Sequence, residues 1–293
     1  MDIKNLYVGW EQLGVGLNDL NAELNEAQNE ENRQEEVQCE CNEQCQSACQ
    51  SLDEESLAVQ EQQEASRINR PIVNLISKPQ NMLKTVYTAC RTCYSADYPI
   101  NIYNSTDDEE KMLKLIERVI SSGHYSTIEH IQVSFAIANV SRACTHQLVR
   151  HRHMSFSQKS QRYVKEKGQF DYIIPPTIDR NPELKQKFEE FMEMISMQYQ
   201  EFVDAGIPAE DARFVLPNAA ASSMVASLNL REMIHLANLR LCTRAQYEIR
   251  IMVKMMCEAL VAEEAWLKPY LVPKCERLGF CDEDKSCGRI PTR

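Results

Sequence analysis

From Pro71 onward, the pattern of apolar and polar residues predicts short strands and amphipathic helices. A two-residue period over 131–137 places Val133, Phe135 and Ile137 on one face of a strand, in line with Ile131. The other elements predicted in this half are a strand at Ile72–Ile76, a helix at Met82–Cys93, and a helix that the capping box Thr106–Glu109 opens and Gly123 ends.

The second half of the chain is predicted to be mainly helical. Its predicted elements are a helix from the cap Ser141 through Val149, a strand at Phe170–Ile174 that Pro175 stops, a helix from about Pro182 to Ala205, and helices opened by the pairs Asn229–Glu232 and Thr243–Gln246. In the long helix, the residues expected to face inward are Phe188, Phe191, Met192, Ile195 and Tyr199. In the Asn229 helix, Arg231, His235 and Asn238 are expected to form a polar face.

The stretch Arg150–Tyr163, RHRHMSFSQKSQRY, follows neither a helical nor a strand period, so it is predicted to be neither a core helix nor a core strand. It combines guanidinium groups with hydroxyls and an amide. Such groups suit a phosphate-bearing ligand, because arginine pairs phosphate bidentately and serine and glutamine fill other acceptor sites. A solvated basic loop is the alternative that the composition alone favours.

Residues 1–70 differ from the rest in being rich in Glu and Gln, with 16 acidic and 4 basic residues. This composition cannot bury enough apolar surface for an independent fold, and it predicts an extension that is weakly helical or disordered. The extension carries Cys39, Cys41, Cys45 and Cys49, whose spacing matches no common zinc pattern.

The net charge of −11 therefore lies in the extension, and the body is close to neutral. A neutral body argues against a nucleic-acid partner, including an RNA-binding role for the basic stretch. No apolar run approaches membrane-spanning length, and no signal-peptide pattern is present, so no membrane partner is expected. Twelve cysteines without a secretion signal indicate the reducing cytoplasm. The 269–293 tail contains Cys275, Cys281 and Cys287, which could form a metal site together with Cys257. Their spacing leaves this open.

Four segments, in order, resemble the flavin-dependent thymidylate synthase family. The first, His124–His130, has the form HxSxxEH. In the second, Arg150–Tyr163, seven residues separate the triplet RHR from Ser160. The third is Arg213 before an apolar triplet and a proline. The fourth, Asn229–Ile249, has the pattern N-x-R-x3-H-x4-R followed by AQYEI. The resemblance covers about residues 71–268, which are predicted to form the enzymatic domain.

The resemblance implies an α+β fold with a mixed or antiparallel sheet and long packed helices, assembled as a homotetramer whose active sites are shared between subunits. It implies FAD as cofactor, and dUMP, methylenetetrahydrofolate and NADPH as substrates, with dTMP as product. The alternative is a homologue that binds FAD and dUMP without turnover.

Site residues carried over from the resemblance fall into two sets. The residues expected to bind FAD are Ser126, Arg150, His151, Arg152, Gln158, Asn229, Arg231 and His235. The residues expected to bind dUMP are Gln147, Arg150, Gln158, Ser160, Arg162, Arg213 and Arg240. Ser157 and Gln158 stand where some members have Asn and Glu, which removes a carboxylate. Arg240 is the expected catalytic residue, since it would stabilise negative charge on the pyrimidine. No metal is expected in this site, and Cys242 is expected to pack rather than act as a nucleophile.

Overall fold

The computed structural model describes residues 70–106 and 108–292. The predictions for the acidic extension and its cysteines fall outside these residues. The strands are β1 (Ile72–Ser77), β2 (Gln132–Ser141), β3 (Met154–Gln158) and β4 (Ala221–Asn229). The helices are α3 (Met82–Thr92), α4 (Pro99–Asn104), α5 (Glu109–Ser121), α6 (Arg142–Leu148), α7 (Pro176–Asp179), α8 (Pro182–Asp204), α9 (Ala209–Ala212), α10 (Leu230–Arg240), α11 (Tyr247–Glu263) and α12 (Lys274–Leu278), with short 3-10 turns η3 (Tyr125–Ile128), η4 (Arg213–Val215) and η5 (Ala265–Leu267).

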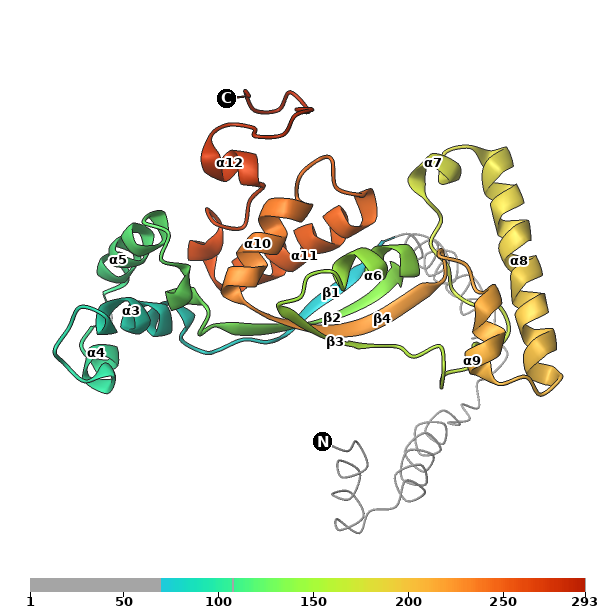
Figure 1. Cartoon of the computed structure of the whole chain (residues 1–293), viewed down its shortest axis with the longest axis horizontal. Coiled ribbons are helices and arrows are strands. Elements are labelled where there is room, and N and C mark those ends of the chain that lie inside the picture. The colour runs from blue at the N-terminus through green and yellow to red at the C-terminus, as the bar shows by residue number, and fades with distance from the viewer. Residues whose placement is uncertain (1–69, 107, 293) are drawn as a thin grey trace, which may run out of the picture. The chain divides into compact units, whose positions relative to one another are not determined.

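One antiparallel sheet organises the described part of the chain, with strand order β1-β2-β4-β3 (Figure 1). The predicted alternation in β2 is confirmed, because Val133, Phe135 and Ile137 are buried and face β4 partners that are buried as well. This side of the sheet lies under α6, α10 and α11 and forms the main core with them (Figure 1). The predicted α+β class with an antiparallel sheet is therefore confirmed.

The opposite face of the sheet carries small and polar side chains together with exposed apolar ones such as Ile72 and Val225. Ser134 and Ser227 join their hydroxyls at 2.7 Å across β2 and β4, and Val225 on β4 is 40% exposed. The two faces thus differ as expected for an antiparallel sheet that buries one side within its own chain.

Two sequence predictions about strands are wrong. Met154–Gln158, within the stretch predicted to be aperiodic, forms the edge strand β3. Met154 and Phe156 face the main core and Ser155 and Ser157 face the other side, so the strand does alternate. Two apolar positions are too few to be recognised as a period among the surrounding polar residues. Conversely, Phe170–Ile174 contributes only an isolated bridge between Tyr172 and Ala220. Ile173 and Ile174 are both buried, which does not fit the alternating faces of a sheet strand.

The helix ends follow local chemistry, with two corrections to the predicted caps. Asp108, rather than Thr106, caps α5 by accepting a hydrogen bond from the Lys111 amide at 3.1 Å. Gln246, rather than Thr243, caps α11 by accepting from two backbone amides. Gly123 ends α5 as predicted, at a φ of 81° that other residues rarely adopt.

The long helix α8 is confirmed over Pro182–Asp204, but its inward face is narrower than predicted. Met192 and Tyr199 are buried, and Met192 joins Phe170 in a second, smaller core cluster. Phe191 is instead 54% exposed, which corrects the prediction for that residue. The second cluster contains few apolar residues, so it covers only one narrow stripe of the helix.

The buried carboxylate of Glu248 links the start of α6 to α11 through hydrogen bonds. Glu248 accepts hydrogen bonds from the Ser141 amide at 2.6 Å and from the Ser141 hydroxyl at 2.5 Å. The same hydroxyl accepts from the Cys144 amide at 3.0 Å and so caps α6 as predicted. Because a buried carboxylate is costly unless it is hydrogen-bonded, this arrangement fixes the start of α6 relative to α11.

The stretch after residue 268 packs against α10 and α11. Leu271 belongs to the main core cluster, and Arg277 of α12 donates to the Asn238 side chain at 2.7 Å. Asn238 is buried because Arg277 and Val272 of this stretch hydrogen-bond to it. Of the three residues predicted to form the polar face of α10, only Arg231 and His235 are therefore exposed. No helix among residues 70–106 and 108–292 is long and apolar enough to cross a membrane.

Candidate functional site

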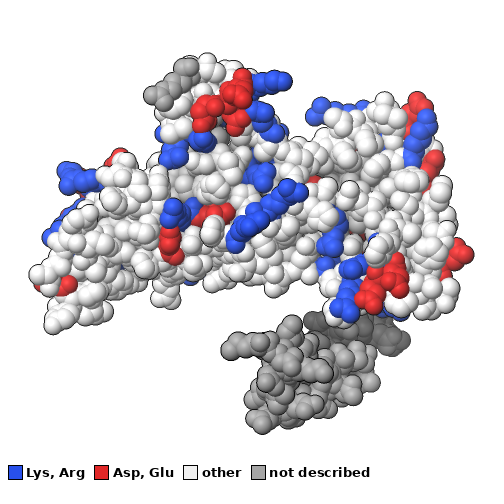
Figure 2. Space-filling model, viewed as in Figure 1, with Lys and Arg blue, Asp and Glu red and all other residues white. Residues whose placement is uncertain are grey.

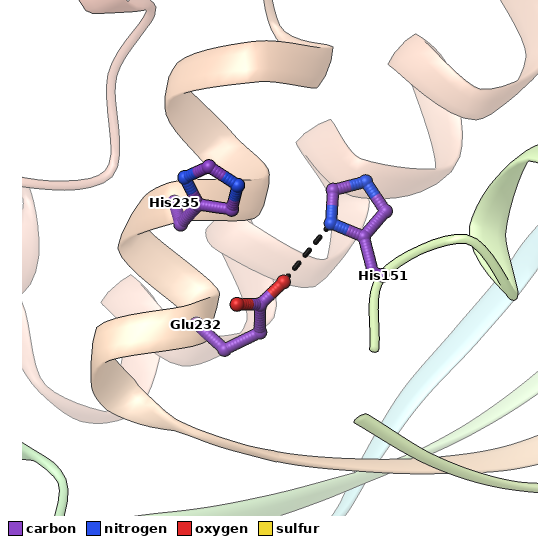
Figure 3. Close-up of side chains that lie close together, drawn as sticks. All are labelled: His151, Glu232 and His235. Atoms are coloured by element: carbon purple, nitrogen blue, oxygen red, sulfur yellow. Dashed lines mark hydrogen bonds and ion pairs between the residues drawn. The ribbon is translucent and has the colours of Figure 1, made fainter. Parts of the chain in front are cut away.

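Three polar side chains from distant parts of the sequence meet between the end of α6 and the first turns of α10 (Figure 3). His151 follows α6, whereas Glu232 and His235 lie three residues apart on α10, on one side of the helix. The rings of His151 and His235 meet edge to face, with centroids 5.9 Å apart. His151 and Glu232 are both only 6% exposed. We call this group, with Arg240, the histidine cluster.

The hydrogen bonds of the histidine cluster define the tautomer of His151. The Nε of Arg240 can only donate, and it lies 3.0 Å from His151 Nε2. Nε2 must therefore accept, so Nδ1 carries the proton and donates to the Glu232 carboxylate at 2.9 Å. Arg240 also donates from Nη2 to the Gln147 carbonyl at 3.5 Å. The chain Glu232–His151–Arg240 consequently fixes the orientation of the Arg240 guanidinium.

His151 is held in its neutral form. Burial lowers the pKa of His151, the hydrogen bond to Glu232 opposes this effect, and the charges of Arg240 and His235 lower the pKa further. A protonated ring would place a hydrogen on Nε2 and remove the acceptor that Arg240 uses. The hydrogen bond from Arg240 therefore requires His151 to be neutral.

The depressed pKa of His151 predicts a loss of stability in mild acid. The unfolded chain binds this proton near the ordinary pKa of about 6.5, before the folded protein does. The contribution of His151 to the free energy of unfolding is therefore fully present above that pH and is lost as the pH falls through it. For one proton, the free energy of unfolding decreases by at most about 1.4 kcal/mol per pH unit. We expect His151→Asn to flatten this slope in urea titrations between neutral and mildly acidic pH. An unchanged slope in the variant would show that His151 is not the group responsible.

A second group of charged residues lies around α9 and η4, and we call it the arginine cluster. Arg162 donates to the Glu210 carboxylate at 2.6 Å, and Arg213 donates to the Glu210 carbonyl at 3.1 Å. The Ser160 hydroxyl accepts from the Arg162 amide at 3.2 Å. Of the residues expected to bind dUMP, the structure therefore brings these three together at one acidic residue.

Arg142, which the sequence analysis did not single out, belongs to the arginine cluster. Burial lowers the pKa of Arg142, and the positive charge of Arg213 lowers it further. Two guanidinium groups repel each other, and an anion bound between them would remove that repulsion. The only sequence signal was its place after the predicted cap Ser141, at the start of the helix that leads into the basic stretch.

Helix α6 connects the two clusters. Arg142 at its first position lies within electrostatic reach of Arg213, and the Gln147 carbonyl near its end accepts from Arg240. Five residue steps along a helix correspond to about 7.5 Å. The clusters are therefore separated along α6 by a span similar to that between the phosphate and the base of a nucleoside monophosphate.

The other predicted residues lie around these clusters. Gln158 ends β3 and donates to the buried Ser222 hydroxyl at 3.0 Å. Asn229 caps α10, and Arg231 pairs with Glu129 at 2.6 Å. The remaining residues expected to bind FAD are Ser126, Arg150 and Arg152, and all three are exposed. Ser126 and Glu129 have the spacing of a helix capping box, but they do not form one. The 3-10 turn η3 has no side-chain cap, and the Glu129 carboxylate pairs with Arg231 instead.

The surface around the site is basic in places but not uniformly so. Lys and Arg side chains gather in the middle of the view in Figure 2 and again near α9, where acidic side chains adjoin them. The arrangement suits a ligand with a few localised negative charges rather than a long polyanion.

The histidine cluster is poorly suited to a metal ion. Its three potential ligand atoms lie within 4.8 Å of one another, as a metal site requires. However, both ring nitrogens of His151 are engaged, one of them with the Arg240 guanidinium. A permanent positive charge in this place opposes a second cation, so the cluster is better explained as a device that positions Arg240.

The most informative residue missed by sequence reasoning is Glu232. It was interpreted as a helix-capping partner of Asn229, and its amide does donate to the Asn229 side chain at 2.9 Å. Its carboxylate instead holds His151, which lies 81 positions away in the sequence. A pair of residues so distant carries no local signal.

Comparisons with known proteins agree on one family. The family model described as thymidylate synthase complementing protein matches residues 74–264. A flavin-dependent thymidylate synthase from Nitratidesulfovibrio vulgaris is 42% identical over 240 residues, which cover 76% of this chain and 96% of that protein. A protein of the same description from Clostridium tetani is 38% identical over 236 residues, covering 74% and 93% of the two chains.

A solved structure has a similar fold. The UMP/dUMP methylase PolB from Streptomyces cacaoi, bound with 5-Br dUMP, superposes with a TM-score of 0.59 at 24% identity. The match covers 69% of this chain and 93% of that chain. At this level of identity the similarity concerns the fold.

Proposed function

The chain belongs to the thymidylate synthase complementing protein family, and we propose that it is a flavin-dependent thymidylate synthase that methylates dUMP to dTMP. We further propose FAD as the flavin, methylenetetrahydrofolate as the carbon donor and NADPH as the reductant. Family membership supports the reaction class, and the site geometry supports the way in which the nucleotide is bound.

The observation that carries the proposal is the placement of two cationic sites at the two ends of α6. Arg142, Arg162 and Arg213 lie at one end and suit a phosphate. Arg240 and Gln147 lie at the other end and suit the polar edge of a pyrimidine. A nucleoside monophosphate spans this separation of about 7.5 Å along the helix.

Arg240 has the features of a catalytic electrostatic group. Its side chain is partly buried, and His151 and Glu232 hold it through two hydrogen bonds in series. A guanidinium fixed before the reaction begins can stabilise negative charge on the pyrimidine as the N3 proton is lost, with little reorganisation during the step. His151 acts through Arg240, so it is a positioning residue in this proposal.

The residues around the histidine cluster fit a dinucleotide flavin. Arg150, Arg152 and Arg231 are exposed and supply guanidinium groups for a pyrophosphate, and the exposed His235 offers a ring beside them. Arg231 would exchange its pair with Glu129 for such a ligand. When bound, the flavin supplies the hydride chemistry, and the protein contributes position and electrostatic field.

We also propose that the enzyme is a homotetramer with sites shared between subunits, as the family resemblance implies. The partly exposed face of the sheet and the exposed apolar side chains Phe191, Met194 and Met197 of α8 support an association between copies.

The proposal is tested with the purified full-length chain. We expect a yellow protein whose flavin absorption shifts when dUMP is added, and which forms dTMP from dUMP, methylenetetrahydrofolate and NADPH. Replacement of NADPH by NADH tests the reductant separately. Binding of FAD and dUMP without dTMP formation under any reductant would favour the alternative of a homologue without turnover.

A further inference from the structure

Four cysteines, outside the site described above, line one cavity of about 80 Å³ next to the joint between α10 and α11. Cys242 lies in the joint, Cys275 lies in α12, and Cys281 and Cys287 follow in the final segment. The sequence spacing left Cys257 as the possible fourth member of this set. Cys257 is instead buried in the main core on α11, so the structure selects Cys242 in its place.

The sulfurs come from three separate parts of the chain. Cys275 lies within electrostatic reach of both Cys242 and Cys281. Cys287 lies within hydrogen-bonding reach of the side chain of Thr243, the residue after Cys242. The joint after α10, helix α12 and the final segment therefore bring their cysteines to one cavity, as a shared metal ion requires.

The final segment is folded into a closed loop around its cysteines. Gly279 and Gly288 have φ values of 77° and 78°, which turn the chain before Cys281 and directly after Cys287. The Cys281 amide donates to the Pro291 carbonyl at 2.8 Å and closes the loop. Without a large apolar core of its own, such a short segment is commonly held by a metal ion or by disulfides.

The charges at the cavity also fit a metal–thiolate group. One Zn²⁺ bound by four thiolates has a net charge of about −2. Arg244, Lys274, Lys285 and Arg289 all line the cavity, with Asp282 and Glu283 beside them. Arg244 pairs with Glu283, Lys274 with Asp282 and Arg289 with Glu276, so these cations are held at the wall of the cavity that the cysteines line.

We propose that Cys242, Cys275, Cys281 and Cys287 bind one structural Zn²⁺ ion. Four thiols lose four protons as the ion binds, with no change in oxidation state. Among the described residues, only the histidine cluster brings three ligand atoms within 4.8 Å, so the cysteine side chains must rotate inward as zinc–sulfur bonds of about 2.3 Å form. The ion then ties the final segment to the joint that follows Arg240.

The test measures zinc by plasma mass spectrometry in the full-length chain with Cys39, Cys41, Cys45 and Cys49 all replaced by Ser. This background assigns any remaining metal to the body. We expect about one zinc per chain, and its loss in Cys275→Ser and Cys287→Ser. The matched control is Cys93→Ser, which changes an exposed cysteine at the C-terminal end of α3 and keeps the zinc. Circular dichroism confirms that each variant is folded.

A second measurement needs no substitution in the proposed site. In the same background, we expect cobalt to produce thiolate charge-transfer and tetrahedral d–d absorption bands. Zinc should also protect the four thiols from alkylation until a chelator is added. No bound metal, retention of zinc in both folded Ser variants, or a disulfide among these cysteines in the freshly purified protein would overturn the proposal. None of these readouts depends on dTMP formation.

Discussion

Replacement of Arg240 by alanine is expected to lower dTMP formation by roughly 100-fold to 1000-fold, the loss typical for removal of one preorganised electrostatic group. The reason is that the guanidinium is oriented before reaction by the Glu232–His151 pair and no other described cation is bonded to this pair. The measurement is the rate of dTMP formation at saturating dUMP, with the flavin content of the protein determined from its absorption spectrum.

Two matched variants make this expectation specific. Arg118→Ala removes an exposed arginine from α5 and should leave the rate unchanged. Arg240→Lys retains the charge but loses the planar fork, so it should recover only part of the activity. If Arg240→Ala kept most of its activity with flavin and dUMP bound, the catalytic assignment would be wrong.

Replacement of Arg162 by alanine is expected to weaken dUMP binding by roughly 30-fold, because one charge-assisted pair to the phosphate is lost. FAD binding should change much less, because Arg162 lies in the arginine cluster and the proposed flavin residues lie around the histidine cluster. Calorimetric titration with each ligand separates the two effects. Equal losses for both ligands would contradict the assignment.

Substitution of Glu210 is expected to have the opposite effect on dUMP affinity. Its carboxylate pairs with Arg162 and therefore competes with a phosphate for the same guanidinium. Glu210→Gln removes the competing charge and should strengthen dUMP binding. An unchanged or weaker affinity in this variant would mean that Arg162 does not reach the phosphate.

The sequence was informative wherever the controlling interactions were local. The two-residue period predicted β2, the helical period predicted α8, and Ser141 and Asn229 were correctly identified as helix caps. Each of these features depends on residues a few positions apart, so it can be read along the chain. The ordered motifs also placed the chain in its family, because fixed spacings carry information about a site even before its geometry is known.

Tertiary structure determined the features that depend on contacts between distant residues. It placed β3 at the edge of the sheet, joined Glu232 to His151, brought Arg142 within electrostatic reach of Arg213, and placed Cys242 rather than Cys257 at the cysteine cavity. No periodicity records such contacts, since packing decides which elements meet. The types of residue in the site were therefore predictable from sequence, whereas the partners that orient them arise only when the sheet and its helices assemble.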